Sequence, residues 1–127
     1  MADHGVFYWN ERITRRPKEA CDFYARTLGW RFEEMPMPDG VYRVAKLGDR
    51  PVAGVLEMKG EQFEGVPEQW LAYIAVDDVD KRLADARQAG AKVLREPFDV
   101  EGVGRIAILK DPGGAPLGWI TPRPSAT

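Results

Sequence analysis

Residues 17–32 read PKEACDFYARTLGWRF, and residues 79–93 read VDKRLADARQAGAKV. Both stretches predict an amphipathic helix that ends at a glycine, Gly29 or Gly90, and continues at once as a strand. A glycine just past a helix end adopts the left-handed backbone at little cost and lets the last carbonyls find partners. The repeat predicts two similar halves packed with pseudo-symmetry. The cleft between or within the halves is then the expected place for function.

Each half has the same order of elements. The first half begins with an aromatic-rich strand from Val6, and short strands follow its helix. The second half begins with a strand from Gln69, and the strand after its helix starts at Ala91 and ends before Pro97. Leu83 and Phe23 are expected to be the buried anchors of the two helices. The predicted order is therefore βαβββ, twice.

This order predicts an α+β fold, in which two βαβββ modules form a curved mixed sheet around a cleft, with the helices on the outer face. A chain of 127 residues is long enough for one domain with one sizeable core. We expect module one at about residues 6–59, a linker at residues 60–68 and module two at about residues 69–121. The linker is expected from its glycines, its proline and its polar residues.

The composition excludes several classes of protein. The net charge is −2, and the 30% of charged residues are mixed in sign along the chain, without the basic stripe that nucleic-acid binding requires. No segment is apolar over a membrane-spanning length, and the N-terminus does not read as a signal peptide. A single cysteine, Cys21, cannot form an internal disulfide and is expected to be a small buried thiol. A cytoplasmic location is expected.

The chain resembles the vicinal oxygen chelate superfamily, which includes glyoxalase I, bleomycin-resistance proteins and extradiol dioxygenases. Four stretches carry the resemblance: EACDFY at 19–24, LGW at 28–30, VDDVD at 76–80 and DPGG at 111–114. Their order and spacing extend across nearly the whole chain. One departure is Arg16, because the family often has an acidic residue before the first helix. Arg16 predicts a weaker helix cap there and leaves the predicted fold unchanged.

The resemblance implies four strand positions that bind a divalent metal through His and Glu. In this chain those positions carry Trp9, Ala53 or Gly54, Leu71 and Gly118. None of these side chains can bind a metal, since such sites need imidazole or carboxylate donors. A shifted alignment offers Glu11 or Glu57, but residues 69–121 contain no histidine. We therefore predict no metal and no cofactor.

The same positions predict a pocket for a small molecule. Alternate residues of a strand share a face, so the residues two away from each former ligand position join it. The predicted ligand-binding residues are Phe7, Trp9, Glu11, Gly54, Leu71, Tyr73 and Gly118. The two glycines would remove side-chain volume where a ligand could enter. A core filled by these aromatic and aliphatic side chains is the alternative.

The catalytic residues are not identified by the sequence, and Glu11 is the most suggestive polar residue for such a role. A carboxylate flanked by aromatic residues can have a raised pKa and act as a base. The alternative is an ion pair with a basic residue, either Arg12, Arg43, Lys46 or Arg105. Tyr42 and Tyr73 could donate a hydroxyl hydrogen bond or simply pack.

These observations favour metal-independent binding of a small, partly aromatic molecule. One alternative is a superfamily enzyme, of lyase, isomerase or dioxygenase type, that acts through Glu11 or a tyrosine. A drug-sequestering resistance protein and a purely structural domain are further alternatives. A homodimer is compatible with the resemblance. The sequence leaves open whether the modules pair within one chain or exchange between two.

Overall fold

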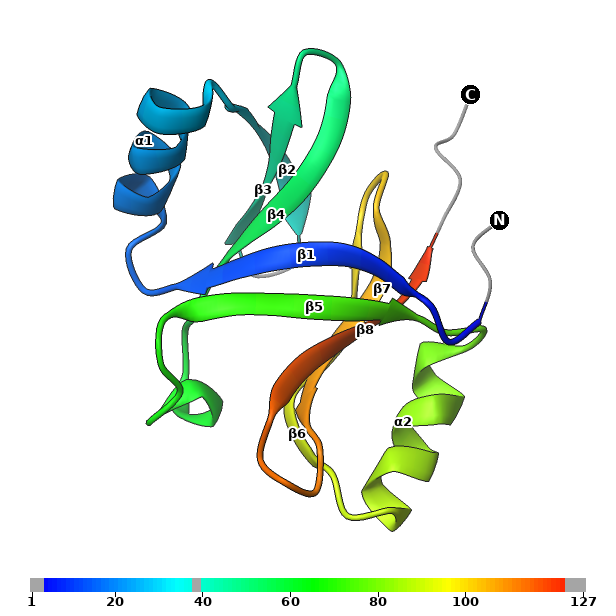
Figure 1. Ribbon diagram of the computed structural model, residues 1–127. Coiled ribbons are helices and arrows are strands. Elements are labelled where there is room, and N and C mark those ends of the chain that lie inside the picture. Colours follow the sequence, from blue (N-terminus) through cyan, green and yellow to red (C-terminus); the bar gives the residue numbers. More distant parts are fainter. Residues whose placement is uncertain (1–3, 38–39, 123–127) are drawn as a thin grey trace. The chain divides into compact units, whose positions relative to one another are not determined.

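The computed structural model describes residues 4–37 and 40–122. The helices and strands follow the predicted order. The first set is β1 (Phe7–Thr14), α1 (Pro17–Leu28), β2 (Arg31–Met37), β3 (Gly40–Leu47) and β4 (Arg50–Glu57). A 3-10 turn, η1 (Glu61–Phe63), follows. The second set is β5 (Gln69–Ala75), α2 (Val79–Gln88), β6 (Lys92–Val100), β7 (Gly104–Lys110) and β8 (Pro116–Pro122). The α+β class and the two βαβββ modules are confirmed (Figure 1).

The described residues divide into two compact units, which are residues 9–70 and residues 71–122 together with 4–8. We call them the first and second unit. The boundary after Trp70 lies close to the predicted start of module two. A second boundary falls inside β1, after Tyr8.

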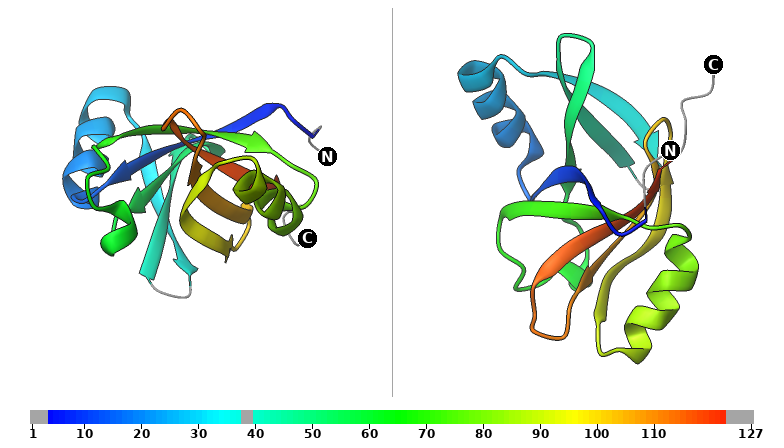
Figure 2. Two further views of the ribbon diagram at one scale, coloured as in Figure 1. Left: turned by 90° about the horizontal axis from the view of Figure 1, so that it is seen from below. Right: turned by 45° about the vertical axis from the view of Figure 1, so that its right-hand side comes forward.

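In the first unit the strand order is β1-β4-β3-β2. Strand β1 pairs with β4 in parallel, and the other neighbours are antiparallel. The second unit repeats this arrangement as β5-β8-β7-β6, with β5 parallel to β8. Each unit therefore has a mixed sheet, and each helix lies to one side of the strands of its own unit (Figure 2).

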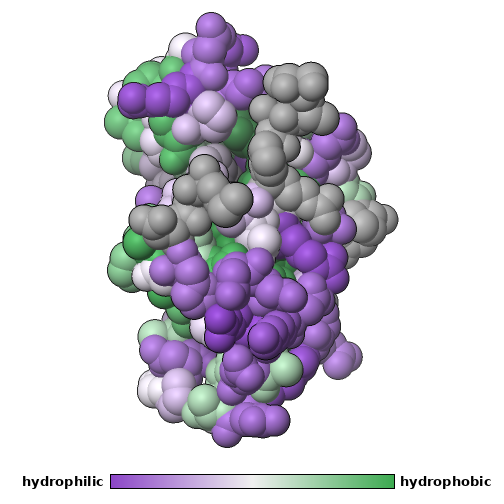
Figure 3. All heavy atoms as spheres, turned by 90° about the vertical axis from the view of Figure 1, so that its right-hand side faces the viewer, coloured by the Kyte–Doolittle hydropathy of each residue, from purple (hydrophilic) through white to green (hydrophobic). Residues whose placement is uncertain are grey.

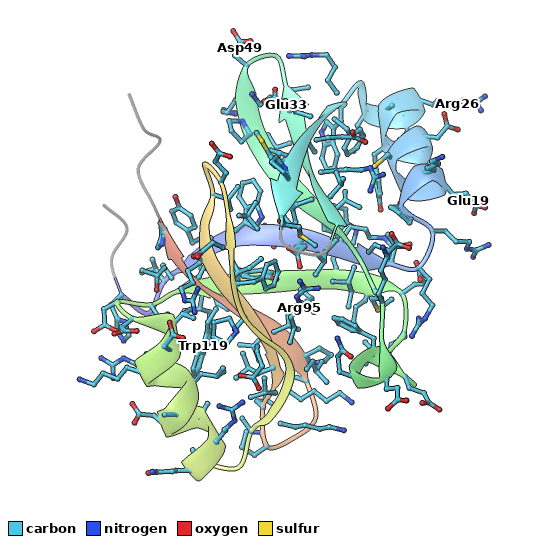
Figure 4. All side chains as sticks on the ribbon, turned by 180° about the vertical axis from the view of Figure 1, so that it is seen from behind. Glu19, Arg26, Glu33, Asp49, Arg95 and Trp119 are labelled. Carbon is cyan, nitrogen blue, oxygen red and sulfur yellow. The ribbon has the colours of Figure 1, made fainter. Side chains whose placement is uncertain are left out.

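The helix α2 is well anchored. The Asp78 carboxylate accepts a hydrogen bond from the backbone N–H of Lys81 at 3.2 Å and caps the helix, as the sequence predicts. Leu83 is 1% exposed, and its cluster includes Val79 and Ala86, with Trp119 of β8 packed against it (Figure 4). The side of the molecule that carries α2 is mostly hydrophilic at its surface (Figure 3).

The helix α1 differs, and one prediction about it is wrong. All twelve of its residues are described and none is buried; Phe23 is 57% exposed. The partly buried side of α1 carries Pro17, Ala20, Cys21 and Tyr24. Phe23 lies about 100° around the helix from Tyr24, because successive residues are rotated by that angle. Within the described chain Arg16 makes no side-chain cap at this helix, as predicted.

The strand β6 is longer than predicted. It continues through Pro97 as far as Val100. The pairing of β6 with β7 shifts in register between Val93 and Arg95 and again between Arg95 and Phe98. A proline lacks a backbone N–H, so an irregular strand at a sheet end can hold one without losing a hydrogen bond of the ladder.

The predicted linker is tied to the first unit. The Arg15 guanidinium donates to the backbone carbonyls of Val66 at 2.9 Å and Phe63 at 2.7 Å. The Arg15 backbone N–H donates to the Glu68 carboxylate at 2.8 Å. Phe63 and Val66 are also buried. The segment is therefore packed rather than a free connection.

Candidate functional site

The strand β1 carries the first of the predicted site residues. Phe7 is 76% exposed, Trp9 is half-buried and Glu11 is 0% exposed. These alternate residues share one face of the strand. Along that face the strand passes from a solvent-exposed ring to a fully buried carboxyl group.

Tyr42 of β3 completes a polar group in the first unit. The Trp9 Nε1–H donates a hydrogen bond to the Tyr42 hydroxyl oxygen at 3.0 Å. The Tyr42 hydroxyl is also hydrogen-bonded to Glu11. Tyr42 is fully buried, so a half-buried indole is linked through a buried phenol to a buried carboxyl group. We call Trp9, Tyr42 and Glu11 the β1–β3 polar group.

Burial sets the protonation state of Tyr42. Burial, followed by the neighbouring Glu11 carboxyl group, raises the pKa of Tyr42 well above its ordinary value, since both disfavour a phenolate. The hydroxyl therefore keeps its proton at neutral pH. With its oxygen accepting from Trp9, its proton is available to Glu11.

Gly54 lies where the sequence predicts room for a ligand, and the structure corrects the reason for that glycine. Gly54 pairs with Glu11 across β1 and β4. A Cβ atom built on Gly54 would lie 1.7 Å from the Tyr42 hydroxyl oxygen. The space is therefore taken by the tyrosine ring.

The second unit repeats this close approach with a different tyrosine. Tyr73 of β5 pairs with Gly118 of β8, and a Cβ atom on Gly118 would lie 2.2 Å from the Tyr73 ring. Leu71 and Tyr73 are both fully buried. The Tyr73 ring therefore occupies the space that a side chain at position 118 would need. Here too, the expected opening is filled by a side chain.

The predicted ligand-binding residues thus divide between the units. The first unit brings Trp9, Glu11 and Gly54 together, and the second brings together Leu71, Tyr73 and Gly118. The pairing also supports the equivalences used in the sequence analysis. Glu11 opposes Gly54 as Tyr73 opposes Gly118, so Trp9 and Leu71, each two residues earlier, occupy matching positions.

The sequence analysis considered Tyr42 only as one of two tyrosines whose hydroxyl could donate a hydrogen bond. The signal that places it in the site is its spacing from the glycine. Val44 pairs with Gly54, so Tyr42 lies two residues along β3 on the same face of the sheet. A tyrosine ring can then lie diagonally over a glycine on the neighbouring strand.

The basic residues considered as ion-pair partners of Glu11 each pair with another carboxylate. The pairs are Arg12–Glu68, Arg43–Glu34, Lys46–Glu33 and Arg105–Asp80. One contact of Glu11 is a hydrogen bond with the neutral phenol of Tyr42. The ion pair of Glu11 considered in the sequence analysis stays a prediction.

The four positions that the sequence analysis assigned to metal binding carry no side chain able to donate to a metal. Trp9, Gly54, Leu71 and Gly118 offer an indole, two hydrogens and an alkyl chain, and none of these coordinates zinc, iron or manganese. Among residues 4–37 and 40–122, no three or more His, Cys, Asp or Glu side chains are grouped to hold an ion. The described helices include none that is long and apolar enough to cross a membrane.

Comparisons with known proteins agree with the fold. Residues 9–117 match the family model described as "Glyoxalase/Bleomycin resistance protein/Dioxygenase superfamily". The chain is 41% identical over 121 residues to the putative glyoxylase CFP32 of Mycobacterium tuberculosis and 32% identical over 108 residues to the anthracycline biosynthesis protein DnrV of Streptomyces peucetius. These alignments cover 94% and 76% of this chain but 45% and 39% of the relatives. The chain thus spans less than half the length of these relatives.

Solved structures show the same fold at low sequence identity. The methylmalonyl-CoA epimerase of Mycobacterium tuberculosis superposes with a TM-score of 0.62 at 16% identity, covering 98% of this chain and 93% of the epimerase. A variant of the Streptomyces coelicolor epimerase, in complex with 2-nitronate-propionyl-CoA, superposes with a TM-score of 0.60 at 21% identity. That alignment covers 98% of this chain and 100% of the other. At these identities the likeness concerns the fold alone.

Proposed function

Because this chain belongs to the glyoxalase/bleomycin resistance protein/dioxygenase superfamily, we propose that it binds a small, partly aromatic molecule without a metal, against the face of β1 that carries Trp9 and Glu11. The observation that carries the proposal is the β1–β3 polar group. The half-buried indole of Trp9 offers a stacking surface for an aromatic ligand. Its Nε1–H is held in place by the hydrogen bond to Tyr42, which is itself hydrogen-bonded to Glu11. Apolar surface with a few convergent polar groups is typical of ligand sites.

The metal-free part of the proposal rests on the donor chemistry. The four residues at the family's ligand positions supply no imidazole and no carboxylate. Glu11 lies two residues beyond the first of those positions and is hydrogen-bonded to Tyr42. The remaining predicted contacts, Phe7, Leu71, Tyr73 and Gly118, stay predictions, as do a cytoplasmic location and a homodimer.

Ligand titration tests this proposal. A panel of phenols, naphthols and aromatic amines is titrated by calorimetry against the native chain, Trp9→Ala and Trp70→Ala, with EDTA and with added zinc, nickel or manganese. Stacking on an indole contributes about 0.5–1.5 kcal/mol, so Trp9→Ala should weaken binding about 2- to 13-fold. Trp70 is the control, because its indole donates to Tyr24 at 3.0 Å in a separate aromatic cluster.

Two results would reject the proposal. The first is equal affinity for the native chain and Trp9→Ala. The second is binding that appears only when a metal is added, together with about one bound metal ion per chain by elemental analysis. Binding unchanged by EDTA and weakened only by Trp9→Ala would support it.

A superfamily enzyme acting through Glu11 or Tyr42 is the second candidate. Glu11 is fully buried beside a proton-bearing phenol, an arrangement that allows a proton to be held and transferred. Since a structural neighbour is a methylmalonyl-CoA epimerase, the direct test is exchange of the substrate α-proton of methylmalonyl-CoA in deuterated water. Exchange lost in Glu11→Gln would favour the enzyme. No exchange in the native chain would count against epimerase-type chemistry. A drug-sequestering role stays an alternative, to be tested by including cationic antibiotics in the panel.

A further inference from the structure

One face of α1 carries exposed side chains. A shallow hollow along the helix is lined by Glu19, Asp22, Phe23, Arg26 and Thr27. These positions recur at the three- and four-residue spacing that places side chains on one side of a helix. We call this surface the outer α1 face. Figure 4 shows Glu19 and Arg26 projecting from α1 away from the strands. Glu19 and Phe23 also line a second hollow, together with Thr14 and Glu68 of the first unit.

The outer α1 face is apolar at its centre. Phe23 is 57% exposed and meets the Tyr24 ring edge-on, with 5.0 Å between the ring centroids. Short helices gain most of their stability from packing an apolar side, and α1 buries none of its twelve described residues. Burial of an exposed phenylalanine side chain against a partner protein would stabilise such a helix.

The charges of this face are arranged for pairing with themselves. Glu19 lies four residues before Phe23, and Arg26 lies three residues after it. If two copies of α1 run antiparallel about a two-fold axis near Phe23, Glu19 of each copy faces Arg26 of the other. Because a two-fold contact joins the same patch on both copies, the Glu19–Arg26 pair between copies occurs twice.

The present partners of these charges can be exchanged. Glu19 pairs with Arg16 at 3.4 Å and Arg26 with Asp22 at 3.7 Å, and all four side chains are at least 68% exposed. Exposed pairs within a helix contribute little, so replacing them by pairs between copies has a small cost.

We propose that α1 pairs antiparallel with α1 of a second copy of this chain, with Phe23 at the two-fold axis and Glu19 facing the second copy's Arg26. The occupant of the face is a second copy because the charge pattern complements itself. This inference deepens the homodimer named under the proposed function and is independent of the ligand site.

Sedimentation equilibrium across 0.5–100 µM protein tests the pairing, with ligand titration run on the same samples. The native chain should dimerise, and Phe23→Ala, Glu19→Arg and Arg26→Glu should each weaken association at least tenfold. The double variant Glu19→Arg/Arg26→Glu should restore association, because the exchanged charges again face each other. Lys81→Glu, on the exposed surface of α2, is the control and should associate like the native chain.

A cross-link supplies a second readout that does not need the charge variants to fold. In a Cys21→Ser background, Phe23→Cys should form a disulfide between copies under mild oxidation, and Lys81→Cys should not. A native chain that stays monomeric at 100 µM would overturn the proposal. So would a dimer that survives the single charge variants, a double variant that is not restored, or equal cross-linking at both positions. Loss of the dimer with ligand binding intact separates this pairing from the ligand site.

Discussion

The two units share a chain path but hold their helices by different means. In the second unit, Asp78 caps α2, and the helix buries Leu83 among neighbours from the strands. In the first unit, α1 begins at Pro17, the preceding Arg16 makes no side-chain cap, and none of the twelve described helix residues is buried. A repeated order of elements therefore does not imply repeated packing. What differs is which residues of each helix face its own sheet.

The glycines show a second difference between the units. In the first unit a tyrosine from β3 covers Gly54, and in the second a tyrosine from β5 covers Gly118. The position of Tyr73 in the second unit is held by Glu11 in the first. Only the first unit thus places a carboxyl group beside its glycine at this position. This is why the proposed ligand site is assigned there.

The largest effect is expected from removing the buried anchor of α2. Leu83→Ala should lower the free energy of unfolding by about 2–5 kcal/mol, as truncation of a buried leucine does. Phe23→Ala is the matched change in α1 and should alter it by no more than about 0.5 kcal/mol at protein concentrations where copies are apart. Denaturant unfolding of both variants measures the contrast. Equal losses would mean that α1 packs as α2 does.

The next effect comes from filling the glycine positions. Gly54→Ala and Gly118→Ala should each destabilise by about 1–3 kcal/mol, since a buried tyrosine must move to admit the methyl group. Gly113→Ala is the control, because its Cβ atom would meet its nearest neighbour at 3.5 Å. Thermal unfolding of the three variants measures this. Destabilisation no greater than that of Gly113→Ala would show that the tyrosines do not occupy these spaces.

A smaller loss is expected at the cap of α2. Asp78→Ala should cost about 1 kcal/mol, because the Lys81 N–H loses its acceptor. Denaturant midpoints measured at constant slope would report the change. Asp78→Asn retains an acceptor and should stay close to the native chain. A loss of equal size for both variants would point to a role other than capping.

The smallest effect is a gain at α1. Arg16→Asp supplies the acceptor that the helix does not have among its described residues and adds a negative charge at its N-terminus, where the helix dipole favours one. An increase of about 0.5 kcal/mol in the free energy of unfolding is expected. A decrease would mean that the Arg16–Glu19 pair matters more than the cap.

The order of elements was predictable because its signals are local. Gly29 adopts the left-handed backbone at the C-terminal end of α1, and Asp78 caps α2, as the sequence indicates. The burial of Leu83 also follows from helical spacing. The exposure of Phe23 did not follow, since its neighbour Tyr24 faces inward with Ala20 and Cys21, and several apolar residues leave the rotation of a helix ambiguous.

The proximity of Trp9, Glu11 and Gly54 was predictable, but the side chain that fills the space beside Gly54 was not. Counting along strands placed Trp9, Glu11 and Gly54 near one another, and the pairing of β1 with β4 agrees. What fills the space beside Gly54 depends on a residue of a third strand, Tyr42, and on how its register brings the ring across. The contact of the Tyr42 ring with Gly54 depends on how neighbouring strands pair, and the spacing of residues within one strand does not predict that pairing.

The hydrogen bonds from Arg15 to the segment after β4 affect where the chain can be opened for circular permutation. A connector between repeated halves is an attractive place to open a chain for circular permutation, because termini are tolerated where backbone is exposed and unbonded. Here the carbonyls of Phe63 and Val66 are both engaged by one guanidinium. New termini placed between them would release Arg15 and uncover buried side chains. The turn at Gly48-Asp49, between β3 and β4, is exposed. Its Gly48 carbonyl accepts from the Arg31 guanidinium at 2.9 Å, but both turn residues are exposed, so this turn is the better place to open the chain.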